Sequence, residues 1–448
     1  MKKTLLASLL LAALPTLAAP GDAERIVARA TDNTRAYDTL SYLTDNIGAR
    51  LSGSKSADLA VKWATQQFKQ WGIDVRTEPV MVPHWVRGIE TGSLVSHNNQ
   101  KIVLTALGGS VATPAEGITA ELIEVNNYDE LKALGKEKIK GKIVVYNNPM
   151  NLELVRNGRA FEAYSEAVEY RGRGASRAAE LGAVASLIRS VASASLRTVH
   201  TGAMRYDDKF PKIPAAAMTV EDSLLVHRLL GKGEKVRMHL VLTPKTLPDV
   251  QSANVIAEIQ GTEKPEEIVL VGGHLDSWDL GTGAIDDGSG VAMVMETMRL
   301  IKELGLKPKR TIRGVLFMNE ENGLRGGRAY FAAHKGDKHV AAIETDAGAA
   351  APTGFLTSLK GDALSALETK AKVLDRVGAA KFQFTPETGA DTSFLVEAGV
   401  PGYGFVPDAR HYFDYHHTPA DTLDKIDPKE LAQDTAAVAG LTWVLADE

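Results

Sequence analysis

The chain has 448 residues, of which 44% are hydrophobic and 24% are charged, and it contains no cysteine. Its 51 Lys and Arg against 56 Asp and Glu give a formal net charge of -5, which excludes a basic nucleic-acid-binding protein. The length suits two or three globular domains, and the lack of cysteine excludes thiol nucleophiles, disulfides and thiolate metal sites, so any metal must be held by His, Asp and Glu.

The first twenty residues have the composition of an export signal. Two lysines precede an apolar run from Leu5 to Leu14, and Ala18 and Ala19 offer small residues for cleavage. This run is too short to span a bilayer, which takes roughly 20 residues. We therefore expect residues 1–19 to be a signal peptide and the protein to be exported, periplasmic or secreted, without a membrane span.

Residues up to about 83 predict a helix followed by a strand. Apolar side chains recur at helical spacing at Ala57, Ala60, Val61, Ala64 and Phe68. Gly72 ends this helix, and a strand is expected over Val75–Val82. These elements are too few for a domain of their own, so we expect them to join a later part of the chain.

From about residue 88 to residue 244 the pattern changes to short β-branched runs separated by glycines. Strands are expected at Lys142–Tyr146 and Lys235–Leu242, and the alanine-rich stretch Ala175–Ile188 predicts a helix. This pattern is typical of a separate α+β module, which we place at residues 89–244.

After Pro244 strands and helices alternate. The expected elements are strands at Asn254–Ile259, Ile268–Gly272, Thr311–Asn319 and Ala341–Asp346, and a helix at Ser289–Leu304. Such alternation predicts an α/β fold with a mostly parallel, helix-covered sheet. We expect residues 20–88 and 245–448 to form this domain, with the α+β module inserted between them.

The densest group of polar residues lies between the strand and the helix expected at 268–272 and 289–304. This position is the carboxyl-end crevice of an α/β sheet, where ligands bind. A cation is expected there, because His274, Asp276 and Asp286 would otherwise carry unpaired buried charge. Helix capping by Asp287 or Ser289 is the alternative interpretation, but it explains only one or two residues of the group.

Three further polar groups follow later in the chain. They are Glu320 and Glu321 after one expected strand, Asp346 after the next, and His416 and His417 ahead of Asp421. Alone, the first two groups are typical of turns. Together with the first group they predict a two-metal site, in which ions about 3.5–4 Å apart share a carboxylate. Asp286 is the candidate bridge, and the remaining candidate ligands are His274, Glu321, Asp346 and His417.

These motifs resemble those of the di-zinc exopeptidase family, which includes bacterial secreted leucine aminopeptidases and glutamate carboxypeptidases. In chain order they are His274-x-Asp276, Asp286-Asp287-x-Ser-Gly290, Glu320-Glu321, Asp346 and His417-x-x-x-Asp421-Thr. Further segments are similar to the plasma glutamate carboxypeptidase branch of the family and extend the resemblance over nearly the whole mature chain: Ile47–Ser54, Val82–Gly88, Arg189–Ser193, His200–Gly202, Pro211–Pro214 and Thr219–Asp222.

The resemblance implies two Zn²⁺ ions held by the five candidate ligands. It further implies that Glu320 is the general base that activates a hydroxide bridging the two ions, and that Asp276 orients the His274 imidazole. His416 stands where related carboxypeptidases carry a Tyr that stabilises the tetrahedral intermediate, and Asp421 matches a carboxylate placed behind the metal ligands. The resemblance also implies that residues 89–244 form a protease-associated domain. The implied substrate is a small peptide and the implied assembly is a homodimer, with neither nucleic acid nor membrane as partner.

The residues leave the specificity open. Recognition of both free ends of a short peptide fits a carboxypeptidase or dipeptidase, and an aminopeptidase of the same family is the alternative. Two further interpretations remain: a non-catalytic, receptor-like interaction protein and a single-zinc glutaminyl cyclase. We interpret Arg50, His84 and Arg87 as turn or structural residues.

Overall fold

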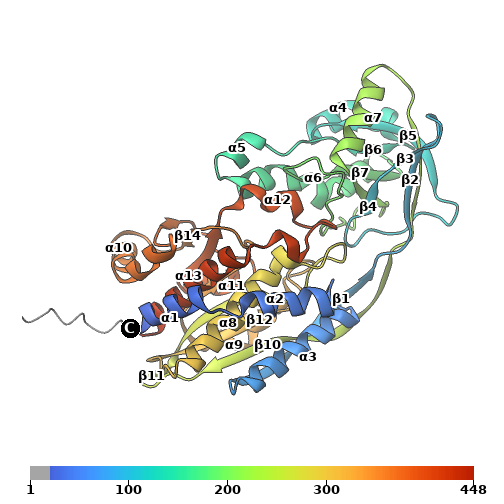
Figure 1. Ribbon diagram of the computed structural model, residues 1–448. Helices are drawn as coiled ribbons and strands as arrows, with labels where there is room; N and C mark the ends of the chain where they lie inside the picture. Colours follow the sequence, from blue (N-terminus) through green and yellow to red (C-terminus); the bar gives the residue numbers. More distant parts are fainter. Residues whose placement is uncertain (1–20, 448) are drawn as a thin grey trace, which may run out of the picture.

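The computed structural model describes residues 21–447 (Figure 1). The predicted signal peptide lies outside these residues. Within them, no helix combines the length and the apolar character needed to cross a membrane. The chain builds two 8-stranded sheets, one from the middle of the sequence and one from the segments on either side of it.

The first sheet is formed by strands on both sides of the middle segment. In spatial order its strands are β1 (Asp74–Val86), β10 (Lys245–Ile259), β12 (Arg310–Phe317), β11 (Lys264–His274), β13 (Lys338–Glu344), β16 (Gly402–Pro407), β14 (Pro352–Thr357) and β15 (Phe382–Phe384). The central strands β12, β11, β13 and β16 are parallel to one another. Their carboxyl ends therefore meet at one edge of the sheet.

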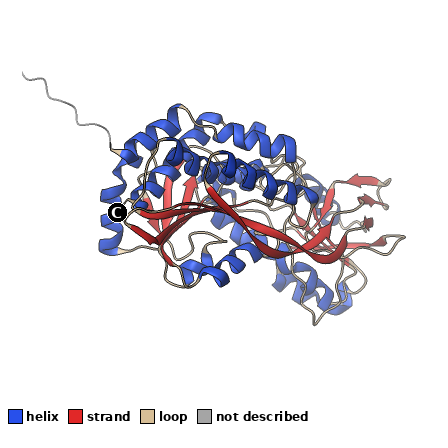
Figure 2. Ribbon diagram, turned by 90° about the horizontal axis from the view of Figure 1, so that it is seen from below, coloured by secondary structure: helices blue, strands red, loops and turns tan. Residues whose placement is uncertain are grey.

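Helices cover both faces of this sheet, because successive apolar side chains of β11 point to opposite faces and both are buried. Val269 and Val271 pack into the larger core, whereas Leu270 packs into a smaller core with Tyr330 and Leu395 on the opposite face. The helices of this part of the chain are α1 (Asp22–Asp32), α2 (Ala36–Tyr42), α3 (Lys55–Gln70), α8 (Ser289–Glu303), α9 (Arg325–His334), α10 (Gly361–Lys370), α11 (Ser393–Glu397), α12 (Tyr412–Tyr415) and α13 (Pro428–Ala446). Figure 2 shows the sheet between its helices.

The second sheet is formed entirely by residues 90–242. Its strands, in spatial order, are β3 (Gln100–Ile102), β2 (Glu90–Leu94), β9 (Arg237–Leu242), β5 (Ile118–Val125), β6 (Ile143–Tyr146), β7 (Ala185–Arg189), β8 (Ala215–Met218) and β4 (Leu104–Ala106). Four helices accompany it: α4 (Tyr128–Ile139), α5 (Leu152–Arg156), α6 (Ala160–Glu180) and α7 (Val220–Gly231). In Figure 1 this green part of the chain lies above the strands that lead into it.

One sequence prediction holds in part and another is wrong. Four of the seven strand pairs of the first sheet are parallel, namely β11 with β12, β11 with β13, β13 with β16 and β14 with β15. The sheet is nonetheless mixed, because the long strands β1 and β10 carry the chain toward the second sheet and back and so pair antiparallel, as do β10 with β12 and β14 with β16. The helix expected at Ala175–Ile188 is instead the end of α6 followed by β7. Gly182, at a φ of 84°, ends the helical path, and the apolar run beyond it is equally compatible with a strand.

Candidate metal centre

The strand ends at the centre of the first sheet carry several predicted site residues. His274 is the last residue of β11, Glu320 and Glu321 follow β12, and Asp346 comes just after β13. These three strands are parallel neighbours, so their carboxyl ends bring side chains from distant parts of the chain to one place.

Asp286 and His417 complete the group from two connecting loops. Asp286 lies between β11 and α8 and is joined to Asp287 by a cis peptide bond. One carboxylate oxygen of Asp286, Oδ1, is 3.0 Å from Nε2 of His274. The other, Oδ2, is 3.0 Å from Nε2 of His417. Asp286 therefore faces the two imidazoles predicted as ligands with different oxygens.

The five predicted ligands form two overlapping groups of three. One group is His274, Asp286 and Asp346, and the other is Asp286, Glu321 and His417; within each, the potential ligand atoms lie within 4.8 Å of one another. Nε2 of His274 is 3.6 Å from Oδ1 of Asp346, and Nε2 of His417 is 3.0 Å from Oε2 of Glu321. A shared carboxylate between two sets of oxygen and nitrogen donors suits a pair of zinc ions.

The electrostatics of the buried carboxylates support a cationic occupant. Burial raises the pKa of Glu321 well above its ordinary value, and repulsion from Asp286 adds to the effect. Burial also opposes the ionised form of Asp286, but charge attraction from His416 and hydrogen bonds from imidazoles outweigh it and hold the pKa of Asp286 well below its ordinary value. Neighbouring carboxylates held at so short a range are stabilised by divalent cations.

Two other predicted residues hold the backbone of the site. Oδ1 of Asp276 accepts hydrogen bonds from the backbone N–H groups of Asn319 (2.7 Å) and Glu320 (3.1 Å), while Nδ1 of His274 is 3.0 Å from the backbone carbonyl oxygen of Asp276 and 3.9 Å from its carboxylate. Asp421 accepts from the N–H groups of Ala284 and Ile285 at 2.8 and 2.7 Å. Both carboxylates thus fix the loops that carry the candidate ligands.

Arg50 and Asp287 have structural roles in the same loop. Arg50 is fully buried and donates to the carbonyl oxygens of Leu275, Thr282 and Gly283 at 2.7, 2.6 and 2.9 Å. Asp287 accepts at 3.0 Å from the N–H of Gly290, at the start of α8, and at 3.0 Å from the N–H of His274. The sequence interpretation of Arg50 as a structural residue agrees with these bonds, and Asp287 ties the helix start to the strand end.

Glu320 and His416 face a cavity of about 400 Å³ beside the two groups. Burial raises the pKa of Glu320 well above its ordinary value, with repulsion from Asp346 and Glu321 in addition. Nε2 of His416 is 3.1 Å from Oδ2 of Asp286. Its ring stacks on that of His417 at a centroid distance of 3.6 Å. Burial, reinforced by His417, lowers the pKa of His416 to about 4, so this imidazole is neutral at neutral pH.

The middle segment contributes residues that the sequence reasoning did not single out. Tyr164, Arg171 and Arg205 line the same cavity, and His200 lies directly behind His416, with 2.9 Å between its Nε2 and Nδ1 of His416. In the sequence, His200 belongs only to a motif that carries the resemblance. No spacing rule links it to residue 416, because the contact depends on how two distant segments pack.

Comparison with known proteins agrees with this geometry. The family model described as "Peptidase family M28" matches residues 254–442. Human carboxypeptidase Q is 42% identical over 416 residues, which cover 92% of this chain and 85% of that protein. A crystal structure of a peptidase M28 precursor from Shewanella amazonensis SB2B is 40% identical, with a TM-score of 0.91 and coverage of 95% of this chain and 96% of the other.

A more distant solved structure shares the fold alone. It is BSAP, a zinc aminopeptidase from Bacillus subtilis, with 21% identity, a TM-score of 0.68, and coverage of 92% of this chain and 97% of that chain. The similarity to carboxypeptidase Q extends over nearly all of the chain, and an identity of 42% over that length is enough to establish family membership. The chain therefore belongs to peptidase family M28 and is a metallopeptidase.

Proposed function

We propose that this chain is a zinc metallo-exopeptidase that hydrolyses dipeptides or short peptides, acting as a carboxypeptidase or dipeptidase. The observation that carries the proposal is Asp286, whose two oxygens face His274 and His417 at 3.0 Å each on the floor of a cavity. That arrangement supports two Zn²⁺ ions, one held by His274, Asp286 and Asp346 and the other by Asp286, Glu321 and His417.

The zinc ions, when bound, supply Lewis-acid chemistry, lowering the pKa of water and polarising the peptide carbonyl. Glu320 is proposed to take the proton of the attacking water and deliver it to the leaving amine, because its carboxyl lines the cavity without belonging to either ligand group. The bonds from Asp276 to the backbone N–H groups of Asn319 and Glu320 keep this carboxyl in place.

His416 is proposed to donate a hydrogen bond to the carbonyl oxygen as negative charge develops on it. This role is supported by its position in the wall of the cavity and by its neutral ring, whose Nε2 points toward Asp286. A fixed donor aimed at developing charge is among the larger contributions to catalysis in enzymes.

The cations of the middle segment favour a substrate with a free carboxylate. Arg171 and Arg205 line the same cavity as Asp286, Glu320, Glu321 and Asp346. Arg171 donates to the hydroxyl of Tyr164 at 2.6 Å and to the carbonyl oxygen of Thr201 at 3.4 Å. A guanidinium in the wall of a cavity suits a substrate carboxylate. The alternative is an aminopeptidase of the same family.

The organisation of the chain is part of the proposal. Residues 20–88 and 245–448 are proposed as the peptidase domain, and residues 89–244 as an inserted protease-associated domain whose side chains limit the length of the substrate. This division is supported by the second sheet, whose strands all lie within residues 90–242. We further propose an exported protein, periplasmic or secreted, that assembles as a homodimer.

Metal analysis combined with a small substrate panel tests the proposed function. The chain, purified without chelator, is expected to contain close to two zinc ions and to lose dipeptide hydrolysis on chelation. The same dipeptide is then compared with its N-acetylated and C-amidated forms. Loss of activity on C-amidation supports the carboxypeptidase or dipeptidase, and loss on N-acetylation alone supports the aminopeptidase. No metal and no turnover after zinc is restored would point to an interaction protein.

A further inference from the structure

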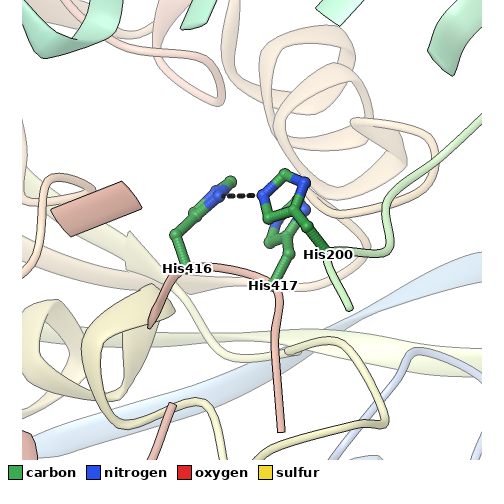
Figure 3. Close-up of side chains that lie close together, drawn as sticks. All are labelled: His200, His416 and His417. Atoms are coloured by element: carbon green, nitrogen blue, oxygen red, sulfur yellow. Dashed lines mark hydrogen bonds between the residues drawn. The ribbon is translucent and has the colours of Figure 1, made fainter. Parts of the chain in front are cut away.

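Three imidazoles cluster beside the cavity: His200, His416 and His417 (Figure 3). His416 and His417 follow α12, whereas His200 comes from the connection between β7 and β8 in the middle segment. The ring centroids of His200 and His416 are 5.0 Å apart, and those of His416 and His417 are 3.6 Å apart. Only the first two rings are joined by a hydrogen bond, drawn in Figure 3.

His200 does not reach the cavity itself. Its side chain has no exposed surface, and it is not among the residues that line the cavity. Whatever His200 contributes to the reaction must therefore act through its neighbour His416, which does line the cavity.

Hydrogen bonds of the backbone hold the segment of His200 against the loop that carries His416. The N–H of Thr201 donates to the carbonyl oxygen of His417 at 3.0 Å, and Nδ1 of His417 is 3.3 Å from the carbonyl oxygen of Thr201. The N–H of His200 itself donates to the hydroxyl of Ser190 at 3.0 Å. The distance between the two imidazoles is thus set by main-chain bonds on both sides.

The partners of His416 determine which of its nitrogens carries the proton. Nε2 faces Oδ2 of Asp286 at 3.1 Å, and a carboxylate can only accept, so Nε2 is the N–H. If Nδ1 of His416 were the donor, Nε2 of His200 would accept and the N–H of His200 would lie on its buried Nδ1, which has no partner among residues 21–447. Nδ1 of His416 is therefore the acceptor. Nε2 of His200, 2.9 Å away, must then be the donor.

The remaining nitrogen of His200 agrees with this assignment. Nδ1 of His200 has no hydrogen-bond partner in the described part of the chain, residues 21–447. If Nδ1 carried the proton, Nε2 of His200 would have none, and two acceptors would face each other across 2.9 Å. With the proton on Nε2, every N–H of the pair has an acceptor.

We propose that His200 is a positioning residue for catalysis: by donating Nε2–H to Nδ1 of His416, it keeps the proton of His416 on Nε2, which faces Asp286 here and is the donor proposed for the reacting carbonyl oxygen. This inference rests on the proposed peptidase function, and it assigns to the middle segment a part in the chemistry besides covering the cleft. A hydrogen bond that selects the tautomer of a catalytic imidazole is a recurrent device in enzymes.

Two substitutions in the zinc-loaded full chain separate this role from simple packing. His200→Phe retains a ring of similar size but removes the donor, and His200→Gln retains an N–H close to the position of Nε2. We expect kcat of His200→Phe to fall by roughly 10–100-fold, the range typical of outer hydrogen-bond partners at metal sites, with KM and zinc content near those of the wild type. His200→Gln is expected to recover most of the lost kcat.

A matched control comes from the same segment. His227 lies on α7 with a side chain 58% exposed. His227→Phe makes the same chemical change away from the cavity and is expected to leave kcat and KM unchanged.

Nitrogen NMR on the wild-type protein labelled with ¹⁵N-histidine measures the tautomer directly. The ring signals of His416, assigned by their loss in His416→Phe, are expected to report an unprotonated Nδ1 and a protonated Nε2. In His200→Phe the Nδ1 signal is expected to shift because its donor is gone, and only Asp286 then favours the proton on Nε2. A protonated Nδ1 in the wild type overturns the proposal even if the Phe variant does not fold.

The kinetic outcomes are also decisive. Wild-type kcat in His200→Phe overturns the proposal, and so does a His200→Gln variant as slow as the Phe variant, because that result assigns His200 to packing. The proposed function is judged separately: zinc-dependent activity of the wild type supports it whatever the His200 variants do, and its absence overturns both.

Discussion

Replacing Glu320 with Gln tests the assignment of the general base. The substitution preserves the shape of the side chain and the bond from the backbone N–H of Glu320 to Asp276 at 3.1 Å, but it removes the carboxylate that accepts the proton. General bases contribute roughly 10²–10⁴-fold to turnover. We therefore expect kcat to fall by that factor, a rise in the barrier of about 3–5 kcal/mol at 1.36 kcal/mol per tenfold.

The neighbouring residue provides a matched control. Glu321→Gln is the same chemical change one residue along the chain, but Oε2 of Glu321 lies 3.0 Å from Nε2 of His417 within a ligand group. Glu320→Gln is expected to retain its zinc, whereas Glu321→Gln is expected to lose part of it. The assay pairs metal content with kcat on one dipeptide. Near-normal turnover in Glu320→Gln, or equal zinc loss in both variants, would refute the assignment.

Three further predictions follow from contacts outside the reacting groups, and a fourth tests the proposed assembly. Asp421→Ala removes the acceptor for the N–H groups of Ala284 and Ile285 and is expected to weaken zinc binding by roughly 10–100-fold in a chelator competition; unchanged affinity would contradict this role. Arg50→Met leaves three buried carbonyl oxygens without their donor and is expected to lower the free energy of unfolding in urea by about 3 kcal/mol or more, so a loss below about 1 kcal/mol would contradict it. Burial lowers the pKa of His339 from 6.5 to about 4. Because the unfolded chain then binds the proton more tightly than the folded chain, the free energy of unfolding is expected to decrease as the pH falls from 6.5 toward 4. In chemical denaturation, His339→Gln should make the free energy of unfolding depend less on pH over this range. Sedimentation of the purified protein is expected to give twice the mass of one chain, and the mass of a single chain would contradict the homodimer.

Much of the candidate site was predictable because its residues occupy strand ends. His274, Glu320 and Asp346 each follow an apolar run that the sequence identifies as a strand, and parallel neighbours place their carboxyl ends together. Buried charges of one sign then require a cation. Local pattern and electrostatics suffice for this inference, so the spacing of the motifs and the lack of cysteine already indicated a site built from imidazoles and carboxylates.

The direction of the outer strands was not available from the same patterns. Side-chain alternation is identical in parallel and antiparallel strands, so β10 could be predicted as a strand but not as an antiparallel partner of β1 and β12. The sequence pattern also did not show where α6 ends. The apolar run 185–189 fits a helix or a strand, and only the turn of the backbone at Gly182 separates it from the helix and makes it a strand.

The sequence by itself determined the nature of the donors, their positions at strand ends and the family to which the chain belongs. Only the tertiary structure decided which side chains of the middle segment meet them. His200 and Arg171 reach the site because the segment between β7 and β8 and helix α6 pack against the loop after α12. Such contacts join residues more than 200 positions apart, and no local spacing encodes them, because they depend on the shape of two surfaces that exist only after folding.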